Sequence, residues 1–430
     1  MTILILGNGG REHALAWKIS KSHHCDKLFI APGNAGTLNF GTNVNLAITD
    51  FEAIKVFCID NTIDVLVVGP EEPLVKGIFD FMEASKDIWK GFVVGPSAAA
   101  AQLEGSKAFS KKFMQRHNIP TAAYAEFTKA NFEEGKAYIV NHALPIVLKA
   151  DGLAAGKGVV ISETHADALE VFENMIIHQQ FGDASSKVVI EEFLEGIEVS
   201  VFALTNGVDY QIIGHAKDYK RIGEGDTGLN TGGMGCVSPV PFMDDLFMQN
   251  IEETIILPTV KGLQTEGLVY HGFIFFGLIN CDGIPKVIEY NCRLGDPETE
   301  VILPRLDTDL LSLFAAMDNG TLEDANINFD DTYFATVMAV SGGYPGDYKK
   351  GKLITFSYDT LDKETMVFHA GTKQTEEGVV TNGGRVLTVT SSGDSIKDAV
   401  EKSTMILKQI HFEGMNYRRD IGFEFDTYDL

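Results

Sequence analysis

The residues with the clearest chemistry lie between Glu289 and Glu300, where oxygen ligands and a cation occur together. Apolar and β-branched residues precede them and predict a strand, in which successive side chains point to opposite faces. Glu289 and Asn291 therefore share one face, and Ile288 belongs to the other. Two oxygen ligands followed by Arg293 suit Mg²⁺ with a polyphosphate, because Mg²⁺ takes few oxygens from protein and the rest from phosphates and water. The stretch predicts a site that consumes ATP.

Arg293 has two interpretations at this point. Its guanidinium is the right group to stabilise charge on a transferring phosphoryl group. Alternatively, Arg293 and Asp296 form a structural ion pair.

A second candidate is the glycine-rich loop from Gly152 to Gly158, which lies between two strand-like runs. A Walker A loop passes from a strand into a helix and ends in GKS or GKT, whereas here Lys157 is followed by Gly158. A flexible hairpin with backbone amides and a lysine could instead close over ATP phosphates. The alternative is an ordinary hairpin loop.

The loop Gly7–His13 joins a predicted strand to a predicted helix. A dinucleotide fingerprint requires glycine where Glu12 stands, which argues against NAD. The free amides at a helix N-terminus still favour a phosphate-bearing ligand. A simple tight turn remains an equal alternative.

Two further charged segments are ambiguous. The segment Lys217–Arg221 precedes the glycine-rich stretch Gly225–Gly235, so it is either an anion site or a solvated face. The glutamates within Val188–Ser200 suit the adenine amino group or ribose hydroxyls, or they are solvated charges at a strand end. No Ser-His-Asp order, HExxH or Cys-His pair stands out, so we expect no covalent enzyme nucleophile.

The elements that must position these residues begin with an alternation of strands and helices, which predicts a parallel sheet covered by helices. Strands are expected at Ile3–Leu6, Leu28–Ala31, Val65–Val68 and Phe92–Val94, and helices at Arg11–Ser20, Thr49–Cys58 and Pro73–Ala84. Each strand ends in a glycine- or proline-bearing loop. Ligands bind outside the carboxyl ends of such strands, where these loops converge.

Beyond this region, Ser106 is expected to cap a helix, and strand-like pieces surround the Gly152–Gly158 loop. A break near residues 329–331 introduces a final strand-rich stretch. We expect an N-terminal α/β domain at 1–103, a second domain at 104–328 with a lid at about 120–190, and a strand-rich domain at 329–430. The fold class is thus mixed α/β and α+β with several domains.

The bulk composition limits the partners. A chain of 430 residues is too long to fold around a single hydrophobic core, so several domains are expected. A formal net charge of −25 argues against a nucleic-acid surface. The five cysteines are scattered without a CxxC pair, which favours reduced thiols. We find neither a signal peptide nor an apolar run near the roughly 18 residues that span a membrane. We therefore expect a soluble, cytoplasmic protein. Separately from these arguments, we expect a monomer or weak homodimer.

Together these motifs resemble the glycinamide ribonucleotide synthetase (phosphoribosylamine–glycine ligase) family of the ATP-grasp superfamily over essentially the whole chain. The most specific parts are Arg293–Glu298 and Asn230–Gly235, supported by Gly7–His13, Ala150–Val159, Gly383–Leu387 and Arg419–Gly422. The resemblance implies that glycine, 5-phosphoribosylamine and ATP give glycinamide ribonucleotide, ADP and phosphate in purine biosynthesis. It also implies an ATP-grasp fold and a glycyl phosphate intermediate.

The resemblance implies a role for each matching residue. Glu289 and Asn291 would hold Mg²⁺ or Mn²⁺. The ATP-binding residues would be Lys107, Lys149, Gly156, Lys157, Gly158, Glu191, the Phe193–Leu194 backbone and Glu198. Phosphoribosylamine would contact Gly9, Gly10, Arg11, Asn34, Glu71, Asp218 and Lys220. Arg293 would bind the acyl phosphate, and Asp296 would orient either a substrate amine or Arg293.

Two positions depart from the family pattern. Tyr219 stands where histidine is more common, which puts a proton-transfer role there in doubt, and Leu229 replaces proline in a loop. Another ATP-grasp ligase, such as a carboxylase acting on bicarbonate, is the main alternative. A nucleotide-binding oxidoreductase and a non-catalytic sensor are weaker ones.

Overall fold

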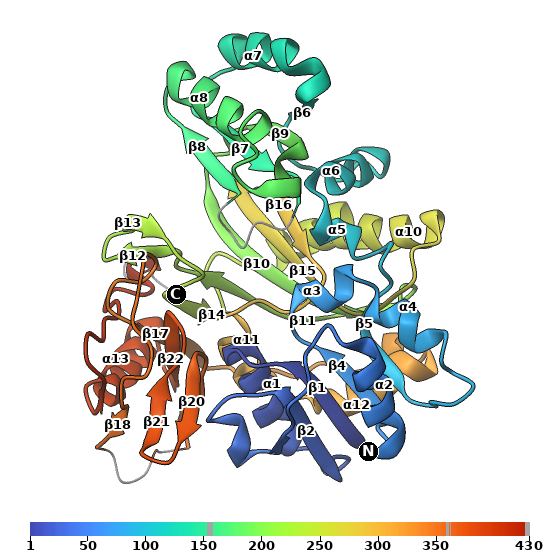
Figure 1. Ribbon diagram of the computed structural model, residues 1–430, viewed down its shortest axis with the longest axis vertical. Coiled ribbons are helices and arrows are strands. Elements are labelled where there is room, and N and C mark those ends of the chain that lie inside the picture. Colours follow the sequence, from blue (N-terminus) through green and yellow to red (C-terminus); the bar gives the residue numbers. More distant parts are fainter. Residues whose placement is uncertain (153–157, 358–360, 362, 426–430) are drawn as a thin grey trace.

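The N-terminal region of the computed structural model is a parallel α/β sheet, as the alternation predicts (Figure 1). The structure describes residues 1–152, 158–357, 361 and 363–425. The strands are β1 (Thr2–Gly7), β2 (Lys27–Pro32), β3 (Thr42–Asn43), β4 (Val65–Val68) and β5 (Phe92–Pro96). The helices are α1 (Gly10–Ser20), α2 (Phe51–Asp60), α3 (Glu71–Val75) and α4 (Ile78–Glu83), with the short 3-10 helix η1 (Thr37–Asn39).

The single helix expected at Pro73–Ala84 is in fact two short helices. Gly77 separates α3 from α4 and has a φ of +89°, a left-handed conformation that a non-glycine residue adopts only with strain. The prediction failed because the apolar pattern continues across the break.

A smaller sheet forms a separate body at the top of the view in Figure 1. Its strand order is β6-β9-β7-β8, and residues of α7 and α8 pack with it in a hydrophobic cluster of its own around Phe172. The elements are β6 (Tyr124–Thr128), η2 (Lys129–Asn131), α7 (Phe132–Asn141), β7 (Ile146–Ala150), β8 (Val159–Ser162), α8 (His165–Ile176), η3 (Gly182–Ser186) and β9 (Lys187–Glu192). Two helices precede them, α5 (Gln102–Gly105) and α6 (Lys107–Arg116).

The central region supplies antiparallel strands. They are β10 (Ile197–Thr205), β11 (Tyr210–Asp218), β12 (Arg221–Gly223), β13 (Thr227–Asn230), β14 (Gly235–Ser238), β15 (Tyr270–Cys281) and β16 (Ile284–Asn291). The helices are α9 (Asp245–Ile251), the π-helical turn η4 (Glu252–Ile256), α10 (Leu257–Glu266), α11 (Thr299–Arg305), α12 (Leu310–Asn319) and η5 (Leu322–Asp324).

The C-terminal region is rich in strands, as expected. It contains β17 (Tyr333–Val340), β18 (Thr355–Phe356), β19 (Thr365–His369), β20 (Thr372–Thr375), β21 (Gly378–Thr381), β22 (Arg385–Gly393), α13 (Ile396–Leu407), β23 (Ile410–His411) and η6 (Phe423–Phe425). Helix α13 packs on β17 and β22.

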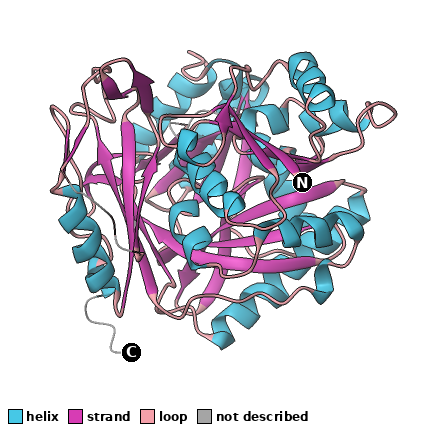
Figure 2. Cartoon of the chain, turned by 90° about the horizontal axis from the view of Figure 1, so that it is seen from below, coloured by secondary structure: helices cyan, strands magenta, loops and turns pink. Residues whose placement is uncertain are grey.

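One 13-stranded sheet connects the three regions in the order β19-β22-β17-β14-β11-β10-β15-β5-β4-β1-β2-β3, with β16 paired to β15. The junction between β15 and β5 is short and involves Tyr270 and His271. Figure 2 shows the strands running through the molecule with helices around them. The boundaries at 103/104 and 328/329 stay predictions. In the part of the chain that the structure describes, no helix combines the length and apolarity needed to span a membrane.

Candidate active site

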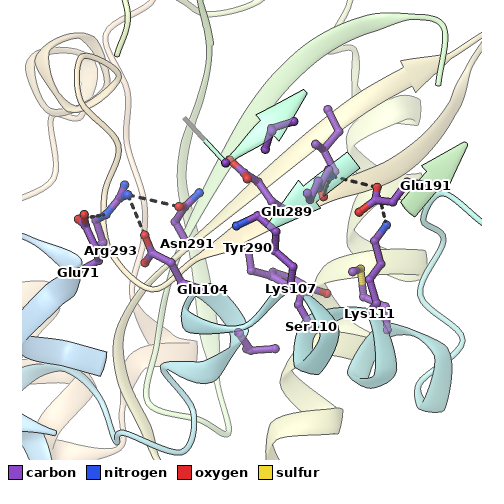
Figure 3. Close-up of a pocket in the computed structure, with 16 residues that line it drawn as sticks. Glu71, Glu104, Lys107, Ser110, Lys111, Glu191, Glu289, Tyr290, Asn291 and Arg293 are labelled. Atoms are coloured by element: carbon purple, nitrogen blue, oxygen red, sulfur yellow. Dashed lines mark hydrogen bonds and ion pairs between the residues drawn. The ribbon is translucent and has the colours of Figure 1, made fainter. Parts of the chain in front are cut away.

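A cavity of about 190 Å³, here called cavity A, opens between the small sheet, helix α6 and strand β16 (Figure 3). It brings together residues far apart in sequence that the motifs singled out. Lys107, Lys149, Gly158, Glu191, Glu289, Asn291, Arg293 and Glu71 all line it. This convergence makes cavity A the leading candidate for a nucleotide and metal site.

Two buried lysines hold Glu191 at one wall of cavity A. The ammonium groups of Lys111 and Lys149 each lie 3.0 Å from Oε2 of Glu191, and all three side chains are at most 6% exposed. Burial lowers the pKa of Lys111 to about 8, although Glu191 opposes this shift. The other oxygen, Oε1, is buried without a hydrogen-bond partner among the described residues. It is therefore free to accept from a ligand donor such as an amino group.

Helix α6 presents Lys107 to the same cavity. Ser106 caps this helix, as expected, by accepting from the Phe109 amide at 3.1 Å. Its hydroxyl also donates to Asp151 Oδ1 at 3.0 Å, and the Ala108 amide donates to the same oxygen at 2.7 Å. The start of the glycine-rich loop is thereby tied to the first turn of α6. Strands β7 and β8 flank that loop, as predicted, while Gly156 and Lys157 lie outside the described residues.

Strand β16 carries the expected oxygen pair. Glu289 and Asn291 both line cavity A, but the pairing of β16 with β15 shifts register so that Ile288 is an extra, bulged residue. Strict alternation therefore fails at Ile288, while the two ligands keep a common side. Figure 3 shows both side chains extending from β16 toward the cavity.

The oxygen ligands in cavity A suit a hard divalent cation. Glu289 has no ion-pair partner among the described residues, and Asn291 adds an amide oxygen beside it. The described part of the chain has no group of three or more His, Cys, Asp or Glu that could hold a metal alone. A site with only two ligating side chains suits Mg²⁺ that shares its shell with phosphates.

Arg293 is enclosed by carboxylates rather than paired with Asp296, so the alternative of an Arg293–Asp296 ion pair was wrong. Its guanidinium lies 2.8 Å from Glu104 and 3.2 Å from Glu71, and it donates to Asn291 Oδ1 at 3.3 Å. Burial raises the pKa of Glu104 against the opposing charge of Arg293. Burial also acts to raise the pKa of Glu71, but Arg293 and backbone donors lower it overall.

Asp296 pairs instead with Arg385 of the C-terminal region. The guanidinium lies 3.1 Å from Asp296 Oδ1 and donates to the carbonyls of Asp296 at 2.7 Å and Gly232 at 2.6 Å. Asp296 Oδ2 also accepts from the Arg11 amide at 3.2 Å. Burial opposes ionisation, but Arg385 and Arg11 lower the pKa of Asp296 overall.

Asp296 borders two further cavities. Cavity B, of about 660 Å³, lies between the loops after β1 and β2 and the loop from β19 to β20, and Gly9, Asn34 and Arg385 line it. Cavity C, of about 420 Å³, is lined by Arg11, Glu12 and the loop Leu46–Thr49, with Gly9 shared. Gly10 lies between these lining residues at the start of α1.

Glu12 fills the position at which a dinucleotide site needs glycine. Its carboxylate accepts from the Gly9 amide at 2.6 Å and from Arg11 Nε at 2.6 Å. A Cβ atom placed on Gly69 would lie 2.1 Å from Glu12 Oε1, so the two loops meet closely. The Glu12 side chain therefore fills the space between the loops of Gly9 and Gly69. A dinucleotide site needs glycine at this position, so the structure also disfavours NAD binding here.

The Asn34 side chain joins the loops after β1 and β2 and the end of β19 by hydrogen bonds. Its amide nitrogen donates to the carbonyls of Asn8 and His369, and its oxygen accepts from the amides of Gly36 and Thr37. The side chain is thus engaged by the protein, although the residue still lines cavity B.

Asp218 and Lys220 lie outside the lining of all three cavities, beside Glu198. Lys220 Nζ is 2.6 Å from Glu198 Oε2 and 3.8 Å from Asp218 Oδ1. Burial raises the pKa of Asp218, with Lys220 opposing. Phe193 and Leu194 lie in the turn from β9 to β10, also outside the lining of these cavities.

The two departures from the family pattern have different structural consequences. Tyr219 is 1% exposed, and its hydroxyl donates to Glu424 Oε2 at 2.8 Å. Burial and Glu424 raise its pKa well above the ordinary value, which disfavours proton transfer. Leu229 is 65% exposed on β13.

Sequence reasoning missed three residues of the site. Lys111 is four positions after Lys107, so helical spacing could have revealed it. Arg385 stood within a recognised motif but received no role. Glu104, which accepts from the Cys292 amide at 2.8 Å, had no local signal because its partners are distant in sequence.

Comparisons with known proteins agree along the whole chain. Family models of phosphoribosylglycinamide synthetase match in order: the N domain at residues 1–104, the ATP-grasp (A) domain at 105–299 and the C domain at 334–424. The phosphoribosylamine–glycine ligase of Vibrio cholerae is 46% identical over 427 residues, which is 98% of each chain.

Solved structures agree with the fold. The crystal structure of phosphoribosylamine–glycine ligase from Thermotoga maritima has a TM-score of 0.85 at 35% identity and covers 98% of this chain and 100% of that one. The biotin carboxylase domain of the Hydrogenobacter thermophilus 2-oxoglutarate carboxylase, in complex with MgADP and bicarbonate, has a TM-score of 0.72. It is 17% identical and covers 99% of this chain and 93% of that one, so it supports the fold alone.

Proposed function

Because this chain belongs to the phosphoribosylglycinamide synthetase family, we propose that cavity A binds ATP and that cavities B and C receive the second substrate. The enzyme is an ATP-dependent carbon–nitrogen ligase of purine biosynthesis. It joins glycine to 5-phosphoribosylamine and yields glycinamide ribonucleotide, ADP and phosphate. The observation that carries the assignment of cavity A is the convergence of Lys107, Lys111 and Lys149 with Glu289 and Asn291.

The nucleotide would lie along the lysine wall of cavity A. Lys107 and Lys149 would contact phosphates, while the free Oε1 of Glu191 would accept from the adenine amino group. The Phe193–Leu194 backbone and Glu198 would complete the base and ribose contacts. Gly158 lines the cavity, and with Gly156 and Lys157 it would cover the phosphates.

Glu289 and Asn291 would hold the divalent cation. The enzyme uses ATP with a metal of the Mg²⁺ type, and we propose that Mn²⁺ can replace it. The cation supplies charge neutralisation for the phosphates, which favours phosphoryl transfer. Since Glu289 and Asn291 are only two ligating side chains, the bound nucleotide would complete the shell.

Catalysis requires positioning and charge stabilisation rather than an enzyme nucleophile. The glycine carboxylate attacks the γ-phosphorus of ATP, ADP leaves, and the acyl phosphate forms. The amine of phosphoribosylamine then attacks the acyl carbon, the amine loses a proton and phosphate leaves. We assign charge stabilisation of the acyl phosphate to Arg293, which Glu71 and Glu104 hold in place.

The phosphoribosylamine end would lie toward cavities B and C. Gly9, Gly10 and Arg11 at the start of α1 offer amides and a cation, and Asn34 fixes the adjoining loop. Glu71, Asp218 and Lys220 would contact the ribosylamine, and Asp296 would orient its amine. The Arg385 contact supports this role for Asp296 because it fixes the carboxylate at the border of both cavities.

The remaining assignments are supported less directly. We propose domains at 1–103, 104–328 and 329–430, supported by family-model matches that begin at residues 1, 105 and 334. A cytoplasmic location is supported by five free cysteines. A monomer or weak homodimer remains our proposal for the assembly.

The decisive experiment measures ADP release with phosphoribosylamine generated in the assay, with and without glycine. We expect release only when both substrates are present, together with glycinamide ribonucleotide. Equal ATP hydrolysis without glycine would contradict the proposal. A parallel reaction with bicarbonate in place of glycine tests a carboxylase activity.

A further inference from the structure

The segment Arg418–Glu424 contacts the back of the strand end that carries Asp218 and Lys220. Tyr219 stands between these two residues, and its ring is 1% exposed. Side chains alternate along an extended chain, so Lys217 and Tyr219 face one side while Asp218 and Lys220 face the other. The contacts agree: Lys217 and Tyr219 both reach Glu424, whereas Lys220 reaches Asp218 and Glu198.

Glu424 connects the two residues on the rear face. One carboxylate oxygen lies 2.8 Å from Lys217 Nζ, and the other accepts from the Tyr219 hydroxyl at 2.8 Å. Lys217 Nζ also lies 4.1 Å from the centre of the Tyr219 ring. Lys217 is 11% exposed in its side chain, so it needs this carboxylate to offset its buried charge.

Arg418 anchors the same segment to the hairpin β12–β13. This residue is 1% exposed, and its guanidinium lies 2.6 Å from Asp226 and 2.8 Å from Asp420. Asp420 in turn accepts from the Gly225 amide at 2.6 Å. The hairpin and the end of β11 are therefore held from behind by one segment.

Backbone hydrogen bonds of Tyr219 and Lys220 connect the anchored rear side of the strand end to its front side. The carbonyl of Tyr219 accepts from the Met234 amide at 2.7 Å, and the carbonyl of Lys220 accepts from the Thr231 amide at 2.7 Å. We propose that Glu424, acting through Tyr219 and Lys217, is a positioning residue that sets Asp218 and Lys220 for phosphoribosylamine. This inference rests on the proposed function of those two residues.

The loss of Glu424 would release Lys217. Its ammonium also lies 3.4 Å from the Asp218 carbonyl, so movement of a freed Lys217 would disturb the backbone that positions Asp218 and Lys220. The expected defect is weaker use of phosphoribosylamine, with ATP binding in cavity A unaffected.

The test compares Tyr219→Phe and Glu424→Gln with Tyr210→Phe. Tyr210 is the matched control because it lies at the other end of β11 and donates to Glu252 at 2.7 Å. We expect Tyr219→Phe and Glu424→Gln to raise the KM for phosphoribosylamine by about five- to ten-fold, the effect of losing one charge-assisted hydrogen bond. The KM for ATP should change less than about two-fold, and the double variant should show no additive effect.

The outcomes are distinguishable. An inactive wild-type enzyme with glycine and phosphoribosylamine overturns the proposed function itself. An active wild type with variants equal to Tyr210→Phe overturns only the positioning role, as does an equal rise in the KM for ATP. If Glu424→Gln lacks a cooperative melting transition, Tyr219→Phe decides alone because it removes a single hydroxyl.

Discussion

Glu289 is the carboxylate on which the proposed metal site depends. It lines cavity A without an ion-pair partner among the described residues, so its removal leaves no unpaired cation behind. We expect Glu289→Ala to lower kcat at least about 100-fold, since a lost metal ligand removes charge stabilisation in the transition state. Thermal unfolding should change little.

Steady-state kinetics over a Mg²⁺ titration check this expectation. The matched control is Glu401→Ala, an exposed carboxylate on α13. Wild-type turnover by Glu289→Ala at limiting Mg²⁺ contradicts the ligand assignment.

Glu298 gives a prediction on stability and pH. Burial, and then the nearby Asp218, raise its pKa from 4.5 to about 7. Between pH 4.5 and pH 7, Glu298 holds a proton in the folded protein that it has lost in the unfolded chain. Its contribution to the free energy of unfolding is therefore fully present below pH 4.5 and is lost as the pH rises through 7. Glu298→Gln should therefore stabilise the protein at pH 8, by up to about 3 kcal/mol, with a smaller gain at pH 5.

Urea unfolding at pH 5 and pH 8 measures the difference. Glu401→Gln is the control, since an exposed glutamate should give the same small change at both values. An effect of Glu298→Gln that is equal at the two pH values argues against the raised pKa.

Residue-level reasoning from the sequence succeeded where the signal was local. Glu289 and Asn291 are two positions apart on one strand, so their common side followed from strand geometry. The ion-pair alternative for Arg293 named the wrong partner, because Glu71 is 222 positions away. No local pattern shows which of several acidic residues a fold brings to an arginine.

At the scale of elements, the cap of helix α6 is expected to affect both the stability of the protein and the binding of ATP in cavity A. Ser106 caps α6, and Ser395 caps the remote α13 by accepting from the Asp398 amide at 3.1 Å. Replacing either serine by alanine should cost about 1 kcal/mol. Only Ser106→Ala should also raise the KM for ATP several-fold, because Lys107 follows the cap and Asp151 loses a contact.

Unfolding experiments and ATP kinetics on both variants test this coupling. The matched loss of a cap separates general destabilisation from an effect on the site. Equal ATP kinetics in the two variants would show that the cap has no influence on Lys107.

Helices and strands were predicted well where hydrophobic periodicity determines their position. They were predicted poorly where a single backbone irregularity interrupts them. The parallel order of β1, β2, β4 and β5 matches the alternation in sequence. The bulge at Ile288 was not predictable, because register depends on the partner strand β15 and not on β16 alone.

At the scale of the molecule, the small sheet has a hydrophobic core of its own that is much smaller than the cores of the 13-stranded sheet. Its cluster around Phe172 is separate from the two large clusters, which lie on opposite faces of the 13-stranded sheet. Small cores open at lower free energy than large ones. We expect amides of residues 124–152 and 158–192 to exchange with solvent faster than those of β1, β4 and β15, and ATP to slow them selectively.

Hydrogen exchange followed by mass spectrometry, with and without ATP and Mg²⁺, measures this difference. The long strand β10 is the internal control, since it lies in the large sheet directly after the small one. Equal protection of the two sheets without nucleotide would contradict the expectation.

The arrangement of whole regions was only partly predictable. The sequence indicated three regions, but not that β17 pairs with β14 and β15 with β5 to continue one sheet. These contacts join segments without local signals, and they bring Arg385 to Asp296.

The contact between Glu12 and Gly69 has an evolutionary consequence. Since Glu12 is held by the Gly9 amide and Arg11, it cannot easily make room for a Cβ atom at Gly69. A larger residue at position 69 becomes acceptable only after the side chain at position 12 has shortened. The two positions are therefore epistatic, and the order of substitutions determines which descendants of this sequence can still fold around the loop.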